Sequence, residues 1–508
     1  MIVSIRNLNY SGGYEWKISR SKGRTTVKIN WGVAAFLVLI TAVCQAETAS
    51  LLILHTNDIH DHVRADYDGV GGMAYVSGYI QSVRKDRSDV LVLDAGDVME
   101  KGDLVAYLDK SDLTYRTMAA AGYDVVVPGN HDDAYGLEHL QQLSSLMSKT
   151  KFVAANITDA DTKPIYPAST IVTVNGVRIG IIGIARPNDA LREKEVDLAR
   201  RVRKEANALK DQTDLLVVLT HNGSRACRTF SAMAPDVDIF VSGHSHEIIK
   251  TPIVVDRTGA LIVQAGDYAN YVGRLELTID LDKKEITKHS GSLVKMDHAV
   301  IPENISVTAL VNAVESKLCP EARSVISRCN EKVNFRDVGL LAAASLYSAS
   351  EADIAFCHPS QIIRDTFPIG DVDVNAVFRT GGQRGSTIVR AQLDGRVIKQ
   401  YVDGLANTEW GQTISFGAES NNIHELADEE VYEVVMPQKE WDTRFLRVMN
   451  RIHSEEKTDL TYEYKVEPCT FTDAVVAFLT SPSNQELAIE DIIANVPKTS
   501  GSKLRIVW

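Results

Sequence analysis

Between residues 50 and 290, short apolar runs alternate with longer stretches in which apolar side chains recur at helical spacing. Helical spacing is clear in 71–86 (GGMAYVSGYIQSVRKD) and 135–149 (YGLEHLQQLSSLMSK). Near-continuous apolar strands separated by helices are typical of an α/β domain with covered sheet faces. Residues 273–281 (GRLELTIDL) instead alternate apolar and polar, which predicts a strand at the edge of the layered core. The apolar runs that we expect to form strands are 50–56, 89–97, 123–130, 151–157, 178–185, 214–221, 238–244 and 261–266.

The pattern changes in the second half of the chain. Residues 305–318 have helical spacing and are expected to link two halves. Beyond them, the runs 352–360, 387–405 and 431–438 mix strand and helix patterns, which indicates a separate α+β unit.

The first 46 residues resemble a secretory signal. Six basic residues and one acidic residue precede the apolar run WGVAAFLVLITAV, which small residues follow. This run is shorter than the roughly 20 apolar residues that a membrane helix needs. We therefore expect a signal peptide over 1–46, a secreted or periplasmic protein, and no stable membrane insertion after cleavage. An uncleaved anchor is the alternative.

The acidic net charge of the chain limits the kinds of molecule that it can bind. Without residues 1–46 the formal net charge moves from −13 to −18. A protein this acidic does not hold a polyanion by general attraction, so we expect no nucleic acid partner and phosphate held only by locally bound cations. No CxxC motif occurs, which argues against a thiolate zinc site. Cys319 and Cys329 would either form a disulfide in an oxidising compartment or remain buried thiols.

Polar side chains follow the apolar strands of the first half at several points. In an open α/β sheet, ligands bind beyond the carboxyl ends of the strands, so segments far apart in sequence meet there. The polar residues at these strand ends are Asp58 and His60, Asp97, Asn130 and His131, His221, and His244 and His246.

This set has the chemistry of a metal centre. Carboxylates with imidazoles suit Zn, Mn, Fe or Co, and residues two apart on an extended chain share one face. Seven ligands exceed one tetrahedral site and fit two divalent metal ions if a carboxylate bridges them. Asp97 is the expected bridge because its neighbour Gly96 allows close approach. A lone histidine at a strand end usually has a structural role, and we interpret five further residues as turn or solvated groups: His55, Asp61, His62, Asp103 and His139.

The order of these motifs resembles that of the calcineurin-like metallophosphoesterases: Asp-x-His, Gly-Asp, Gly-Asn-His-Asp, His, Gly-His-x-His. Longer segments resemble the 5'-nucleotidase family, with dense similarity over about 50–290. The segments are LHTNDIH, DAGDVMEKG, GYDVVVPGNHDDAYG and VQAGDYANYVGRLEL.

The resemblance implies an α/β fold, with a four-layer α/β metallophosphoesterase sandwich followed by a smaller α+β C-terminal 5'-nucleotidase-like domain. We expect the metallophosphoesterase domain over 47–298, a linker helix region over 299–330 and the C-terminal substrate domain over 331–508.

The resemblance also implies site roles. One metal would be held by Asp58, His60, Asp97 and His246, and the other by Asp97, Asn130, His221 and His244. His131 would be the catalytic histidine beside the phosphoryl group. The implied reaction is hydrolysis of a small phosphorylated substrate, such as a nucleotide (5'-nucleotidase or 2',3'-cyclic phosphodiesterase type), by metal-activated hydroxide.

Two departures from the family pattern leave alternatives open. The carboxylate that orients the catalytic histidine in the family is replaced by Ala134, and Asp132 or Asp133 would have to reach His131 instead. In the second domain, only Arg364 matches a substrate-binding arginine, and the aromatic residues that stack on a base are not recognisable. A hydrolase of a non-nucleotide, sulfur-containing ester and a metal-retaining binding protein without turnover are therefore the alternative functions.

We predict that the mature protein begins near Glu47 and lies outside the cytoplasm, because small residues occupy the positions before that cut. N-terminal sequencing of the exported protein checks this. Recovery of residues before Ala42 would contradict cleavage at this point.

Overall fold

The computed structural model describes residues 15–19, 24–28, 47–187, 193–382, 386–406, 414–417, 423–456 and 461–499. The expected signal peptide lies outside the described residues except for two short antiparallel strands, β1 (Glu15–Ser19) and β2 (Arg24–Lys28). None of the helices in the described part of the chain has the length and apolar character needed to cross a membrane.

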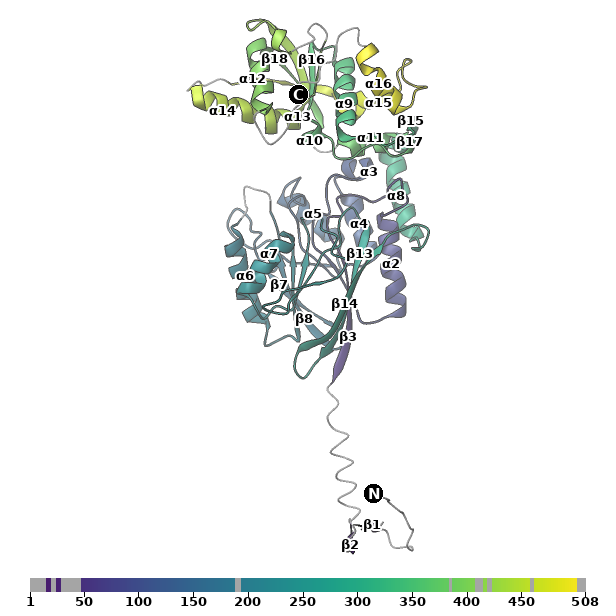
Figure 1. The fold of residues 1–508 in the computed structure, drawn as a ribbon, viewed down its shortest axis with the longest axis vertical. Coiled ribbons are helices and arrows are strands. Elements are labelled where there is room, and N and C mark those ends of the chain that lie inside the picture. The colour runs from purple at the N-terminus through teal and green to yellow at the C-terminus, as the bar shows by residue number, and fades with distance from the viewer. Residues whose placement is uncertain are drawn as a thin grey trace.

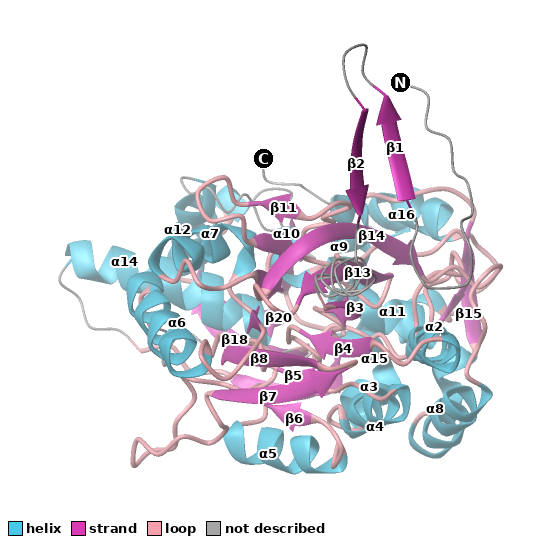
Figure 2. Cartoon of the chain, turned by 90° about the horizontal axis from the view of Figure 1, so that it is seen from below, coloured by secondary structure: helices cyan, strands magenta, loops and turns pink. Residues whose placement is uncertain are grey.

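Among the described residues, the N-terminal domain contains two six-stranded sheets packed between outer helices (Figures 1 and 2). The first sheet has the order β14-β13-β3-β4-β5-β6 and the second the order β11-β12-β10-β9-β8-β7. In the first sheet the strands are β3 (Thr48–Thr56), β4 (Val90–Asp94), β5 (Val125–Val126), β6 (Lys151–Phe152), β13 (Tyr271–Asp280) and β14 (Glu285–Lys295). In the second they are β7 (Ser169–Val174), β8 (Val177–Ile184), β9 (Leu215–Thr220), β10 (Ile239–Ser242), β11 (Ile253–Val254) and β12 (Leu261–Val263).

Helices cover the outer faces of both sheets, which confirms the predicted four-layer sandwich (Figure 1). Along β8, Ile179 and Ile181 face the core between the sheets, whereas Ile182 and Ile184 face the core under the helices. Burial on both faces explains the continuous apolar runs. The helices are α2 (Met73–Asp86), α3 (Leu104–Leu108), α4 (Asp112–Ala121), α5 (Leu137–Leu146), α6 (Glu195–Leu209) and α7 (Gly223–Met233).

The prediction that 273–281 forms an edge strand is wrong. These residues lie in β13, which pairs with β3 on one side and with β14 on the other. The edge strand is β14, whose largely exposed polar residues gave no clear strand pattern.

Residues 305–318 form the predicted helix, α8 (Ile305–Leu318), which packs against α2 and α4. The side chain of Asn304 caps it by accepting hydrogen bonds from the backbone N–H groups of Ser306 and Val307. The linker helix is therefore packed on the N-terminal domain. The short 3₁₀ helix η2 (Pro320–Arg323) follows it.

The C-terminal domain is α+β, as predicted. Its described strands include a five-stranded sheet of order β19-β16-β20-β18-β21, with α9 and α15 on one face and α12 and α14 on the other (Figure 1). The strands are β15 (Val325–Cys329), β16 (Ile354–Cys357), β17 (Gly370–Asp373), β18 (Thr387–Asp394), β19 (Ile414–Gly417), β20 (Val431–Pro437) and β21 (Lys465–Thr470). The helices are α9 (Phe335–Ser350), α10 (Pro359–Ile362), α11 (Val374–Gly381), α12 (Gly395–Ala406), η3 (Ile423–Glu425), α13 (Gln438–Glu440), the π-helix η4 (Trp441–Phe445), α14 (Leu446–Glu456), α15 (Phe471–Leu479) and α16 (Ile489–Thr499).

Cys319 and Cys329 do not form a disulfide. Both are buried free thiols, as are the other cysteines of the described residues except Cys469, which is a partly exposed free thiol. The sequence left open whether these two cysteines form a disulfide or remain buried thiols, and in the structure they are buried thiols.

A buried polar cluster joins the two domains where α3 meets α11 (Figure 1). The Arg379 side chain, 4% exposed, donates from Nε and Nη2 to Asp103 Oδ1 at 3.0 and 2.7 Å. Asn375 Nδ2 donates to the same carboxylate at 2.9 Å. Burial alone would raise the pKa of Asp103, but the charge of Arg379 holds it below its ordinary value. The interpretation of Asp103 as a turn or solvated residue is therefore wrong.

We predict that Arg379→Ala lowers the free energy of unfolding by about 3–5 kcal/mol, because it leaves the buried Asp103 carboxylate without its cation. Urea denaturation followed by circular dichroism measures the change. Arg328→Ala is the matched control: its 3.6 Å ion pair with Asp371 is more than 60% exposed on both sides, so the loss should stay below about 1 kcal/mol. Equal losses in both variants would contradict a structural role for the buried pair.

Candidate metal centre

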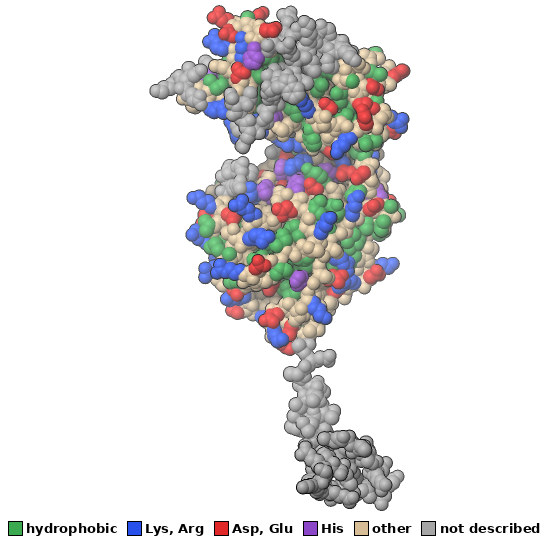
Figure 3. Space-filling model, viewed as in Figure 1, with side chains coloured by type: hydrophobic (Ala, Val, Ile, Leu, Met, Phe, Trp, Pro, Cys, Tyr) green, Lys and Arg blue, Asp and Glu red, His purple; other side chains and the backbone are tan. Residues whose placement is uncertain are grey.

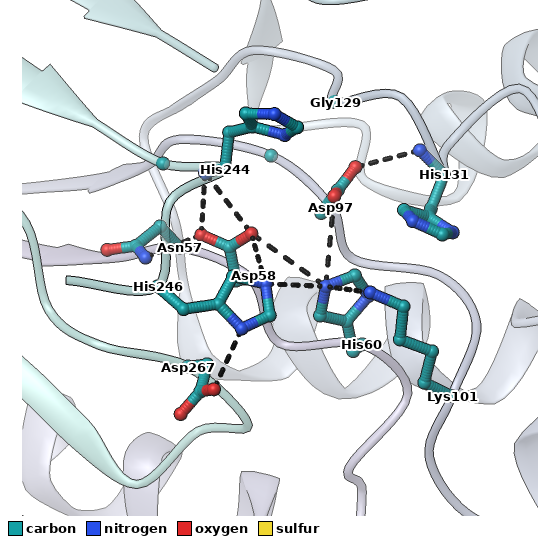
Figure 4. A network of polar contacts seen from close by, with 12 residues as sticks. Asn57, Asp58, His60, Asp97, Lys101, Gly129, His131, His244, His246 and Asp267 are labelled. Atoms are coloured by element: carbon teal, nitrogen blue, oxygen red, sulfur yellow. Dashed lines mark hydrogen bonds and ion pairs between the residues drawn. The ribbon is translucent and has the colours of Figure 1, made fainter. Parts of the chain in front are cut away.

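Six of the seven predicted metal ligands meet at the carboxyl ends of β3, β4, β9 and β10, and the seventh, Asn130, follows the short strand β5. Two groups of His and Asp side chains have ligand atoms within 4.8 Å of one another. The first group is Asp58, His60 and His246, and the second is Asp97, His221 and His244. Figure 3 shows histidine side chains gathered near the boundary between the domains, and Figure 4 shows the centre from close by.

Asp97 faces both groups. Its Oδ2 atom lies 3.0 Å from His221 Nε2 in the second group and 3.7 Å from His60 Nε2 in the first. In the first group, Asp58 Oδ1 lies 3.2 Å from His246 Nε2. This is the placement that the sequence predicts for a bridging carboxylate.

Backbone conformation, rather than extended chain, brings these side chains together. Asp58 and His60 have φ of 54° and 50°, and His244 and His246 have φ of 81° and 54°. Asp97 is also left-handed, with φ of 58°. The premise that each Asp-x-His or His-x-His pair shares one face of an extended strand is therefore wrong. Such conformations are costly for residues with a Cβ and concentrate at functional sites.

Two glycines allow the loops to approach closely. Gly96 has φ of +87°, and a Cβ there would lie 2.6 Å from the backbone N of Gly129. A Cβ on Gly129 would lie 2.2 Å from Asp97 Oδ1. The Asp97 and Asn130 loops therefore pack backbone against backbone, as the Gly96 argument predicts.

Hydrogen bonds to Nδ1 turn the Nε2 atoms of the histidines toward the centre. His60 Nδ1 lies 3.0 Å from Met99 O, and His221 Nδ1 lies 2.6 Å from Ala95 O. His246 Nδ1 lies 2.8 Å from Asp267 Oδ2 (Figure 4). Carbonyl and carboxylate partners of this kind fix the tautomer and orientation of metal-binding histidines.

The buried carboxylates favour positive charge in the centre. Burial lowers the pKa of His60 well below its ordinary value and that of His244 to about 4. For His221, burial is outweighed by the carboxylates of Asp97 and Asp58, which raise its pKa to about 9. For His246, burial is likewise outweighed by hydrogen bonds to Asp267 and Asp58, and its pKa rises to about 9. The residues fit a bound cation.

Asn130 supports the same conclusion. Its Oδ1 atom is buried and has no hydrogen-bond partner among the described residues. Buried polar atoms are normally satisfied. An amide oxygen beside carboxylates and imidazoles completes a donor set suited to divalent ions.

His131 lies beside both groups. Its backbone N donates to Asp97 Oδ1 at 2.8 Å, and its ring centroid is 5.0 Å from that of His60. Asp132 does not reach the ring, because its fully buried carboxylate accepts hydrogen bonds from the backbone N–H groups of Gly129, Asp97 and Val98. The ring instead contacts Glu100, through Nδ1.

Glu100, Lys101 and Asp267 lie at the centre although no sequence argument selected them. Lys101 Nζ is 3.3 Å from His60 Nε2. All three lie within segments that carry the family resemblance, which is the one signal the sequence offers for them. Asp61, interpreted as a turn or solvated residue, lies in a turn and is buried there, where it accepts a hydrogen bond from the Glu100 backbone N–H at 2.7 Å.

His55 and His62 are also buried, whereas His139 is partly exposed and contacts Lys110 O. The interpretation of these residues as turn or solvated groups is therefore wrong for His55, which lies in β3, whereas His62 ends a turn closed by its backbone N–H and Ile59 O.

Arg364 approaches the centre from the C-terminal domain. Its backbone N donates to Thr380 O at 2.7 Å, which fixes the segment after α10. Burial lowers the pKa of Arg364, and the neighbouring Tyr268 and Glu100 of the N-terminal domain oppose that effect. A cation of the second domain therefore lies within electrostatic reach of the candidate metal centre.

Comparison with known proteins agrees with this geometry. Residues 51–248 match the family model described as Calcineurin-like phosphoesterase. The chain is 24% identical over 417 residues to Endonuclease YhcR of Bacillus subtilis, an alignment that covers 73% of this chain and 34% of that protein. It is 28% identical over 337 residues to the 5'-nucleotidase of Diplobatis ommata, covering 58% of this chain and 57% of that protein. The chain thus spans about a third to somewhat over half of the length of these relatives.

Among solved structures, the 5'-nucleotidase precursor from Thermus thermophilus superposes with a TM-score of 0.69 at 20% identity, covering 85% of this chain and 96% of that chain. This similarity includes both domains and confirms the fold. Residues 51–248 therefore form a calcineurin-like phosphoesterase domain, and the chain is similar in sequence and in fold to proteins named 5'-nucleotidase.

Proposed function

We propose that the protein is a two-metal phosphoesterase that acts outside the cytoplasm on small phosphate esters, with a 5'-nucleotidase type of reaction and weak selectivity for the base. The observation that carries this proposal is the position of Asp97 between two groups of imidazoles and carboxylates. The family similarity to proteins named 5'-nucleotidase supports it.

The side chains have distinct roles in this proposal. Asp58, His60, Asp97 and His246 would hold one ion, and Asp97, Asn130, His221 and His244 the other. Two divalent ions would supply a water molecule activated near neutral pH and positive charge for the phosphoryl oxygens.

His131 and Arg364 would act on the substrate itself. His131 lies at the edge of the centre, with its side chain 25% exposed, and would give a proton to the leaving oxygen. Arg364 would hold the rest of the substrate from the second domain.

The C-terminal domain supports weak base selectivity. Residues 438–456 of this domain form α13, η4 and α14. Trp441 and Phe445 are 0% exposed, and their rings stack at a centroid distance of 4.3 Å. These aromatics belong to the domain core and do not offer a face to a base. Trp441 and Phe445 therefore do not supply the stacking energy of about 1–3 kcal/mol that an aromatic side chain gives to a bound base.

We predict that Asp97→Asn lowers kcat/KM for p-nitrophenyl phosphate at least about tenfold more than His246→Asn does, because a bridging carboxylate serves both ions. Steady-state kinetics with added manganese or zinc, together with the metal content of each variant, measure this. His289→Asn is the control, since His289 is exposed on β14, away from the centre, and should leave kcat/KM unchanged. Equal losses for Asp97→Asn and His246→Asn would contradict the bridge.

We predict that AMP, GMP and UMP are hydrolysed with kcat/KM values within about tenfold of one another, and that p-nitrophenyl phosphate is also hydrolysed. Chelation should abolish these activities and metal addition should restore them. A hundredfold preference for one nucleotide would show that the second domain reads the base.

The same assays separate the other function classes. One relative is named an endonuclease, so single-stranded DNA and RNA belong in the comparison; the net charge of −18 without residues 1–46 argues against their binding. Stoichiometric metal binding with no turnover of any ester would favour a binding protein.

A further inference from the structure

His131 has a carboxylate partner, but this partner does not come from the turn around Ala134, where the family pattern has the orienting carboxylate. Its Nδ1 atom contacts Oε2 of Glu100 as an ion pair or hydrogen bond. Glu100 lies on the loop after β4, 31 residues before the histidine. Both side chains are largely enclosed, at 11% exposure for Glu100 and 25% for His131.

On the turn that carries His131, neither Ala134 nor Asp132 offers an equivalent carboxylate to the ring. Ala134 has only a methyl group, and its backbone N donates to His131 O at 3.0 Å. The Asp132 carboxylate is engaged by the backbone N–H groups of Gly129 at 2.6 Å and Asp97 at 2.9 Å. Asp132 therefore ties the two ligand-bearing loops together rather than holding the ring.

Glu100 is itself held in place. Its backbone N donates to Asp61 Oδ2 at 2.7 Å, and Ser111 Oγ donates to the same oxygen at 2.8 Å. Glu100 has φ of +67°, a conformation that favours glycine. A glutamate in a strained, anchored position beside a candidate catalytic residue is what a positioning role requires.

We propose that Glu100 is the positioning residue for His131, taking over the role of the carboxylate that Ala134 replaces. This inference rests on the proposed function. Glu100 accepts the hydrogen bond of Nδ1–H, so that Nε2 is the nitrogen that serves the leaving oxygen.

The proton balance of this step is simple. As the bond between phosphorus and the ester oxygen breaks, that oxygen takes the proton from Nε2 of His131, while the oxygen of a water molecule bonds to phosphorus and one proton of that water passes to solvent. His131 regains a proton from solvent after the products leave. Glu100 keeps its contact with Nδ1 throughout and so holds the ring in the orientation that this transfer needs.

The kinetic test is a double-mutant cycle on the metal-loaded two-domain protein with AMP, because its alcohol leaving group needs a proton whereas p-nitrophenolate does not. We expect Glu100→Ala to lower kcat about 10- to 100-fold with little change in KM. In the His131→Ala background, Glu100→Ala should not lower kcat further, because Glu100 acts only by positioning the His131 ring. Multiplicative losses, or a loss of bound metal in Glu100→Ala, would overturn the proposal. Glu100→Ser, also too short to reach Nδ1, makes the same comparison if the alanine variant does not fold.

Asp133→Asn tests the neighbouring carboxylate on the turn. We expect this variant to keep kcat within about threefold of the wild-type value. This change is much smaller than the loss of kcat expected for Glu100→Ala. A larger loss in Asp133→Asn than in Glu100→Ala would assign the orienting role to Asp133 and overturn the proposal.

A second readout does not depend on turnover. In ¹⁵N-histidine NMR spectra of zinc-loaded protein, the His131 ring is assigned by its disappearance in His131→Ala. The ¹⁵N chemical shifts of the His131 ring should change in Glu100→Ala and stay at their wild-type values in Asp133→Asn, even if no ester is hydrolysed. Unchanged His131 shifts in Glu100→Ala would overturn the positioning role while leaving the proposed phosphoesterase function untouched.

Discussion

The convergence of two buried carboxylates at one end of a double sheet is the constraint on which the rest of the site depends. Asp58 and Asp97 are 0% and 2% exposed and are surrounded by imidazoles. Ionised carboxylates are costly to bury without a compensating cation. The left-handed loops, the glycines that let them touch and the outward hydrogen bonds of the histidines are all consistent with compensation by bound metal.

The loop after β4 connects this constraint to the chemistry. Asp97 begins the loop and faces both ligand groups, while Glu100 and Lys101 contact His131 and His60. Asp61 and Asp132 anchor the loop through its backbone N–H groups. Further along, Asp103 pairs with Arg379 of the C-terminal domain. One short segment thus links the candidate metal centre, the candidate catalytic histidine and the domain interface.

The sequence predicts the layered fold and the meeting of the six candidate ligands that the structure groups, because apolar periodicity and the carboxyl ends of strands are local signals. It does not reveal Glu100 or Asp267, whose partners are 31 and 21 residues away and depend on loop conformation. The sequence also led to the interpretation of Asp103 as a turn or solvated residue, because its partner Arg379 belongs to the other domain and leaves no signal in the residues around Asp103. The strand β14 was missed because its side chains are mostly exposed and polar.

The central claim is that this centre holds two divalent ions with Asp97 between them. Anomalous X-ray diffraction at the manganese edge, on crystals of manganese-loaded protein, tests it most directly. The account predicts two anomalous peaks about 3.5–4 Å apart on either side of the Asp97 carboxylate. A single peak, or two peaks of which neither lies within bonding distance of Asp97, would contradict it.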